Sequence, residues 1–172
     1  MIERETLKIN ESGHLEIGGC DATELSSRFG TPLYVMDEAY IRSVIRGYKE
    51  IFERDYGDGL VCYASKAFST KAIYEICREE GIGADVVSGC ELATALSAGL
   101  SPEGIYFHGN NKTPFELEFA VKSGVHAVVI DSFTQRFRPD LAIEVRHIFK
   151  TVGIGHQNAD VLAAFHFFVL HE

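Results

Sequence analysis

The chain has 172 residues, of which 46% are hydrophobic, and it carries a formal net charge of -9 at pH 7. This length and composition are typical of a globular domain with a core of its own. Lys and Arg are few and dispersed, so the sequence shows no basic surface for nucleic acid or for an anionic membrane. No apolar run approaches the roughly 18 residues that span a bilayer, and the first five residues contain no signal-peptide core. We therefore expect a cytoplasmic protein that binds neither nucleic acid nor membrane.

The cysteines and histidines give no metal or redox motif. The four cysteines are far apart in the sequence and form no CxxC pair; they are Cys20, Cys62, Cys77 and Cys90. His156, His166 and His171 are separated by ten and five residues, which is not the three- or four-residue spacing that shares a helix face. We expect no metal site.

The N-terminal residues predict a hairpin followed by a helix. Residues 7–18 alternate apolar and polar side chains around a polar turn at residues 11–13, which is typical of two short antiparallel strands. Asp21, with Glu24 three residues later, is a capping-box arrangement at a helix start, and Gly30 marks the helix end. Residues 1–30 are therefore expected to form a small region of their own.

From residue 31 the pattern becomes a repeat of strand and helix. The expected strands are apolar runs at residues 33–36, 60–64, 84–87, 105–107 and 127–130. The expected helices are a long one capped by Asp37 and shorter ones at 69–80, 90–98 and 114–123, the last beginning with a capping box of Thr113 and Glu116. Alternation of strands and helices predicts a parallel sheet.

Two architectures fit such a sheet, a (β/α) barrel and a doubly wound sheet. Against the second, no G-x-G-x-x-G turn follows the first or second strand. The repeat of about 21 to 28 residues is compact and favours the barrel. Five strands are too few to close a barrel of eight, so residues 31–133 predict a partial barrel. Residues 134–172 form a divergent tail in which residues 160–170 are apolar enough for a packed helix.

Polar residues gather where the predicted strands end, at the edge where parallel α/β folds bind ligands. Lys66, Asp85, Glu91 and His108 each lie at or just after the carboxyl end of a strand. Partial desolvation at a barrel mouth would favour a neutral lysine amine, which can condense with an aldehyde. Each residue also has a purely structural explanation. Lys66 could extend to water, and Asp85 could cap a helix. Glu91 could be a solvated acid in the first turn of a helix, and His108 could hydrogen-bond the next loop.

Several segments in series resemble the N-terminal half of the barrel of the diaminopimelate decarboxylases. These are pyridoxal-phosphate enzymes of the alanine racemase-like group IV decarboxylase family. The resemblance covers about residues 7 to 133, a run of motifs much more specific than any single one. The segments are TPLYVMD, VCYASKAFST, GIGADVVSGCEL, AGLSPEGIYFHGNNKTPFELEFAV and GVHAVVIDSF.

The resemblance implies roles for the residues at the strand ends. In that family the lysine of the matching Y-A-x-K-A segment, here Lys66, binds the cofactor covalently. Asp85 and Glu91 match carboxylates at the cofactor site, residues 108–112 line the same edge, and Arg136 matches part of an arginine-containing segment. The implied reaction is decarboxylation of meso-diaminopimelate to lysine in a homodimeric enzyme. Relatives that act on ornithine, arginine or carboxynorspermidine are alternatives.

After Ser132 the chain departs from the family pattern. The glycine-rich phosphate loop, the histidine that stacks on the cofactor ring, the acid that pairs with the pyridine nitrogen and the C-terminal β domain are not found. The hairpin at residues 7–18 would pack on that domain. We therefore expect a truncated or internally deleted member with weak cofactor binding. Two classes of function stay open: a decarboxylase that is weak by itself or works with a separate second half, and a non-catalytic relative that binds a partner subunit.

Overall fold

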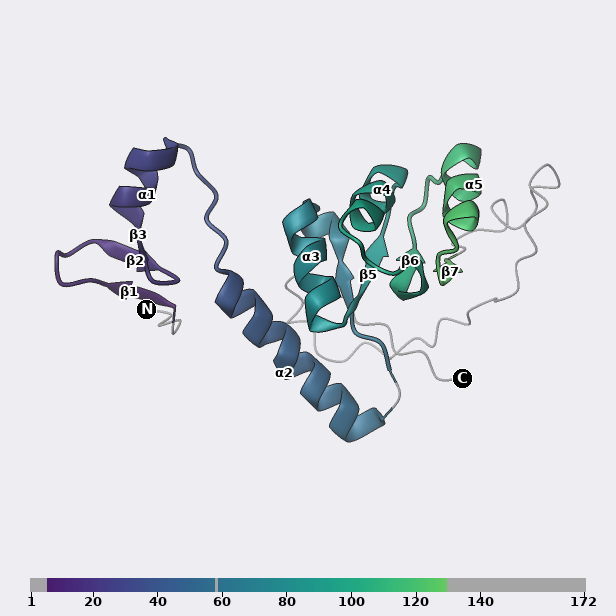
Figure 1. The fold of residues 1–172 in the computed structure, drawn as a ribbon, viewed down its shortest axis with the longest axis horizontal. Coiled ribbons are helices and arrows are strands. Elements are labelled where there is room, and N and C mark those ends of the chain that lie inside the picture. Colours follow the sequence, from purple (N-terminus) through teal and green to yellow (C-terminus); the bar gives the residue numbers. More distant parts are fainter. Residues whose placement is uncertain (1–5, 58, 130–172) are drawn as a thin grey trace. The chain divides into compact units, whose positions relative to one another are not determined.

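The computed structural model describes residues 6–57 and 59–129, in two compact units that we take separately (Figure 1). The first unit is Met1–Ile51 and the second is Phe52–Glu172. The predicted boundaries at residues 30 and 133 stay a prediction, and the tail lies outside the described residues. Within residues 6–57 and 59–129, no helix is both long enough and apolar enough to cross a membrane.

The first unit begins with the predicted hairpin. Strands β1 (Leu7–Ile9) and β2 (Leu15–Ile17) pair antiparallel, with Leu7 opposite Ile17 and Ile9 opposite Leu15. A third strand, β3 (Cys20–Asp21), extends the sheet and was not predicted, because two residues are too few to show an alternating pattern. The hairpin prediction is confirmed.

Helix α1 (Ala22–Phe29) starts and ends where the sequence predicted. The Asp21 carboxylate accepts hydrogen bonds from the amides of Thr23 and Glu24, and Gly30 ends the helix at a positive φ of 81°. The Glu24 side chain makes no reciprocal bond to the cap in the described structure, so only one half of the expected capping box forms. Helix α1 has no buried residue.

The predicted strand at residues 33–36 is wrong. These residues form no strand, and all four side chains are exposed, Tyr34 at 95%. A strand exists only where a neighbour supplies ladder hydrogen bonds, and no described strand pairs with this segment. The helix that follows is as predicted: α2 (Glu38–Tyr56) begins after Asp37, whose carboxylate accepts from the Tyr40 amide at 3.0 Å.

The second unit is a four-stranded parallel sheet with helices along one side (Figure 1). The strands lie in sequence order: β4 (Cys62–Ala64), β5 (Gly83–Val86), β6 (Ile105–Phe107) and β7 (Ala127–Val128). The connecting helices, α3 (Lys71–Glu80), α4 (Gly89–Ser97) and α5 (Pro114–Ser123), pack side by side. Two short 3-10 turns, η1 (Ser65–Ala67) and η2 (Pro102–Gly104), complete the unit.

Unreversed strand order with helices on one side is the arrangement of a β/α barrel, whereas a doubly wound sheet reverses its order and carries helices on both faces. The predicted partial barrel is therefore confirmed, with four strands in place of five. Helix α5 begins with the predicted capping box of Thr113 and Glu116, and Gly81 and Gly124 end α3 and α5 in the left-handed conformation.

The core of the second unit lies between the sheet and these helices. Alternate strand residues share a face, and Ala84, Val86, Ile105 and Phe107 are all fully buried on the same one. The fully buried helix residues are Tyr74, Cys77, Leu92, Ala95 and Ala120. Asp85 lies between Ala84 and Val86 in β5, so its side chain points to the opposite face of the sheet.

Candidate cofactor site

Lys66 lies in the turn that directly follows β4, and this turn is held by two hydrogen bonds. The Phe68 amide donates to the Ser65 carbonyl at 3.2 Å, and the Tyr63 hydroxyl donates to the Phe68 carbonyl at 2.8 Å. Burial raises the pKa of Tyr63 to about 12, so its hydroxyl remains a donor at ordinary pH. The backbone that carries Lys66 is thus fixed on both sides of the residue.

The Lys66 side chain is exposed, and its amine makes no hydrogen bond or ion pair with any described residue. The expected partial desolvation is therefore wrong for the described part of the chain, because Lys66 follows the strand and the sheet does not cover it. Its neighbours Ala64 and Ser65 are small and buried. The Ser65 hydroxyl oxygen is enclosed and has no hydrogen-bond partner among the described residues.

Asp85 and His108 come from the next two strands at the same edge of the sheet. Ala64, Asp85 and Tyr106 are in register, and the His108 amide continues the ladder by donating to the Val86 carbonyl at 2.8 Å. The Asp85 side chain is 10% exposed, and its Oδ2 lies 3.7 Å from Nδ1 of His108. This distance suits an ion pair with a protonated imidazole and is too long for a hydrogen bond.

Glu91 lies in the first turn of α4, beside the end of β5. Its Oε2 accepts a hydrogen bond from the Val87 amide at 2.8 Å. Burial raises the pKa of Glu91, and the nearby Asp85 carboxylate adds to this rise, while the hydrogen bond from Val87 opposes it. Glu91 is therefore a half-buried carboxylate tied to the strand end and not a solvated one.

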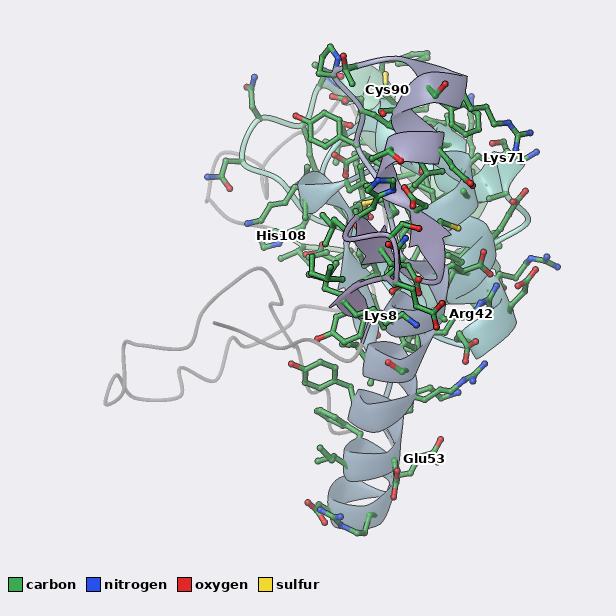
Figure 2. The ribbon with its side chains drawn as sticks, turned by 90° about the vertical axis from the view of Figure 1, so that its left-hand side faces the viewer. Lys8, Arg42, Glu53, Lys71, Cys90 and His108 are labelled. Atoms are coloured by element: carbon green, nitrogen blue, oxygen red, sulfur yellow. The ribbon has the colours of Figure 1, made fainter. Side chains whose placement is uncertain are left out.

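The loop after β6 is fastened to the neighbouring strand ends. Figure 2 labels His108, the first residue of this loop. The Lys112 amine donates to the carbonyls of Gly109 and Val129, the second at 2.7 Å, and so joins the loop to the end of β7. Gly109 has a φ of 103°, and a Cβ there would lie 2.7 Å from the Val87 carbonyl oxygen. Only glycine fits this approach.

Four of the five predicted site residues thus lie at one edge of the sheet, which we call the rim: the carboxyl ends of β4 to β7 with the turns that follow them. Lys66, Asp85, Glu91 and His108 come from three successive strand ends, and Arg136 lies outside the described residues. No cluster of three or more potential metal ligands occurs within residues 6–57 and 59–129.

Sequence reasoning missed one residue at the rim. Glu116 was predicted only as the capping-box partner of Thr113, but its carboxylate also accepts a hydrogen bond from the Gly89 amide at 2.8 Å. The two residues are 27 positions apart. No local pattern signals this contact.

Comparisons with known proteins agree with this geometry. Residues 40–136 match the family described as "Pyridoxal-dependent decarboxylase, pyridoxal binding domain". The chain belongs to this family. Pyridoxal phosphate is the cofactor that such a domain binds, as the sequence resemblance implied.

Several of the similar proteins are named diaminopimelate decarboxylase. The chain is 52% identical to that of Bacillus methanolicus over 128 residues, covering 74% of this chain and 30% of the relative. It is 46% identical to that of Bacillus subtilis over 143 residues, covering 83% and 33%. A crystal structure of diaminopimelate decarboxylase from M. jannaschii in complex with L-lysine superposes with a TM-score of 0.69 at 37% identity, covering 78% of this chain and 32% of that one. The chain spans about a third of the length of these relatives.

The rim residues fit the aldehyde end of pyridoxal phosphate. An amine without a partner in the described structure is the group that bonds to an aldehyde, and it has small neighbours on its strand side. The Asp85 carboxylate, on the next strand in register with Ala64, adds a polar group at the same edge. Lys66 would hold the cofactor covalently, and Asp85, Glu91 and His108 lie at the same edge of the sheet.

Proposed function

We propose that this chain provides the cofactor-binding part of a diaminopimelate decarboxylase, with meso-diaminopimelate as substrate and lysine as product. Support for the substrate comes from the relatives, because those 40% to 52% identical to the chain carry this name. A solved relative is titled as a complex with L-lysine. The observation that carries the proposal is the place of Lys66, which follows β4 at the same edge of the sheet as Asp85 and His108, in a domain of the pyridoxal-binding family.

In the proposed reaction Lys66 has two tasks. Its amine would hold the cofactor through the aldehyde carbon, and when it is not so bonded it would hold or donate a proton at its nitrogen. Bound pyridoxal phosphate supplies an electron sink for the electron pair left behind when carbon dioxide departs. The exposed position of Lys66 leaves its side chain able to move between these tasks.

The other rim residues position groups and hold charge. Asp85 stands at ion-pair distance from His108 at the same edge of the sheet. Glu91 keeps the end of β5 in place through the Val87 amide. The homodimer of the intact family is part of the proposal, because the resemblance implies that the neighbouring subunit completes the site.

The experiment that tests the proposal is chemical trapping at Lys66. The full chain is incubated with excess pyridoxal phosphate, reduced with borohydride and digested, and the modified lysine is identified by mass. We expect the label at Lys66 and its loss in Lys66→Ala. Mass detection with excess cofactor registers even weak binding, so a low cofactor affinity does not hide the result.

Lys71 provides the matched control (Figure 2). It is an exposed lysine at the start of α3, and its amine lies 3.9 Å from the Glu75 carboxylate in a surface ion pair. Lys71→Ala should leave the labelling of Lys66 unchanged. Equal labelling of Lys66 and Lys71, or undiminished labelling in Lys66→Ala, would show that the lysine assignment is wrong.

Substrate choice is tested separately by release of carbon dioxide from meso-diaminopimelate, ornithine and arginine under the same conditions. We expect meso-diaminopimelate to react fastest and Lys66→Ala to abolish release. Faster release from ornithine or arginine would retain the lysine assignment and replace the substrate. Labelling of Lys66 with no release from any substrate would favour the non-catalytic relative.

A further inference from the structure

The Glu116 carboxylate joins the starts of two helices at the rim. Its Oε1 accepts the Gly89 amide at 2.8 Å, and its Oε2 accepts the Thr113 amide at 2.9 Å and the Thr113 hydroxyl at 2.8 Å. Gly89 is the first residue of α4 and Thr113 is the cap of α5. One side chain therefore links two successive β/α units on the side of the sheet where the proposed cofactor site lies.

The turn between β5 and α4 is held by three side-chain oxygens. The Val87 amide donates to Glu91 at 2.8 Å, the Glu91 amide donates to the Ser88 hydroxyl at 3.3 Å, and the Gly89 amide donates to Glu116. The first two bonds lie within the turn and can move with it. The bond to Glu116 comes from the next unit, so it fixes the position of the turn relative to the rest of the rim.

The contact between Gly89 and Glu116 is close and charged. A Cβ added at Gly89 would lie 3.0 Å from Cγ of Glu116, so the approach requires glycine or a shift of the glutamate. Hydrogen bonds from the Gly89 and Thr113 amides lower the pKa of Glu116, so the side chain is ionised at neutral pH. A negative charge at two helix starts is also favoured by the helix dipoles.

We propose that Glu116 is a positioning residue for the cofactor site: through Gly89 it fixes the turn at residues 87–91 and so holds the Glu91 carboxylate next to Asp85. It acts through the backbone of that turn and does not touch the reacting groups. This inference rests on the proposed function, and it goes beyond the capping of α5, for which the bonds to Thr113 are sufficient.

The test compares Glu116→Ala with Thr113→Ala in the full chain. Glu116→Ala removes the bond to Gly89 and half of the α5 cap, whereas Thr113→Ala removes the capping hydroxyl and leaves the Gly89 bond. The readout is the pyridoxal phosphate concentration that gives half-maximal borohydride labelling of Lys66. We expect this concentration to rise roughly tenfold in Glu116→Ala, in the range for loss of a hydrogen bond to a charged group. It should stay within about twofold in Thr113→Ala.

Hydrogen exchange at the Val87 amide distinguishes a positioning role from helix capping, because loss of the α5 cap alone would not change its rate. The Val87 amide is protected by the Glu91 carboxylate, so its protection reports where Glu91 lies. We expect faster Val87 exchange in Glu116→Ala and unchanged exchange in Thr113→Ala. Glu116→Gln has a single acceptor oxygen and should restore part of both the labelling and the protection.

Equal changes in Glu116→Ala and Thr113→Ala, or none in either, would overturn the inference and leave Glu116 as a helix cap. If Glu116→Ala does not fold, Glu116→Gln and Gly89→Ala are compared in its place, since the added Cβ at position 89 strains the same contact from the other side. Failure to label Lys66 in the unchanged chain would instead overturn the proposed function, so the two failures are distinguishable.

Discussion

The two units are held together in different ways. In the first, among residues 6–51, Ile45 is the sole buried apolar residue, while Ile9 is 68% exposed and Phe29 is 59% exposed. Its sheet and helix are joined by polar side chains: the Asp21 carboxylate accepts hydrogen bonds from Asn10, His14 and Thr23. In the second unit, Ile105 and Phe107 are completely buried between sheet and helices.

This difference explains why the proposed site belongs to the second unit. A catalytic group must be held on elements whose positions do not fluctuate, and a close-packed apolar core supplies that rigidity. Polar contacts on a small exposed sheet open more readily, because few apolar contacts are lost when they do. The strand ends that carry Lys66, Asp85 and His108 all belong to the packed sheet.

The largest effect should come from truncating the core of the packed sheet. Phe107→Ala should lower the free energy of unfolding of the second unit by about 3 to 5 kcal/mol, because it removes a fully buried aromatic side chain and leaves a cavity. Urea unfolding of the full chain, with amide exchange in β5 and β6, measures this loss.

Ile9→Ala is the matched truncation in the first unit. Since Ile9 is mostly exposed, the change should stay within about 0.5 kcal/mol. A loss of several kcal/mol in Ile9→Ala would show that the side chain is covered in solution and that the first unit has a core outside the described residues. A small loss in Phe107→Ala would mean that the sheet is loosely packed.

Local signals in the sequence predicted most of the packed unit. The capping box of α5 was predictable because Thr113 and Glu116 are three residues apart, and the glycines that end α3 and α5 follow the helices directly. The placement of Lys66, Asp85 and His108 at one edge of the sheet was also predictable, since parallel strands end at one edge.

Features that depend on distant residues were not predictable in the same way. The apolar segment at residues 33–36 has the composition of a strand, but strand formation needs a partner that composition does not specify. The exposure of the Lys66 side chain depends on which other turns lie around it. The hydrogen bond from the Gly89 amide to the Glu116 carboxylate joins positions 27 residues apart. Only the fold brings such groups together.

A smaller effect is expected at the turn that carries Lys66. Tyr63→Phe removes the hydrogen bond from the Tyr63 hydroxyl to the Phe68 carbonyl and should cost about 1 kcal/mol locally. The Phe68 amide, which donates to Ser65, should exchange faster, and borohydride labelling of Lys66 should slow by a few fold. Tyr34→Phe, at an exposed tyrosine of the first unit, should change neither measurement. Unchanged exchange at Phe68 in Tyr63→Phe would show that the hydroxyl does not hold the turn.

The smallest effect is an acid sensitivity confined to the first unit. Hydrogen bonds from the Thr23 hydroxyl and from His14 lower the pKa of Asp21, so the folded unit binds this proton less readily than the unfolded chain does. The stabilisation is therefore complete above the ordinary aspartate pKa of about 3.9 and is lost as the pH falls through the lower folded pKa. Amide exchange at Thr23 and Glu24, corrected for intrinsic rates, should become faster in acid before exchange in β5 and β6 does.

Asp21→Asn separates this titration from simple acid unfolding. Asparagine keeps an oxygen that can cap α1 but has no carboxylate to protonate, so the acid-dependent part of the exchange at Thr23 and Glu24 should disappear while some protection remains. If the variant keeps the same acid dependence, another group controls it. If the amides of both units lose protection together in the unchanged chain, the polar network does not open independently, and the contrast between a polar and an apolar unit fails.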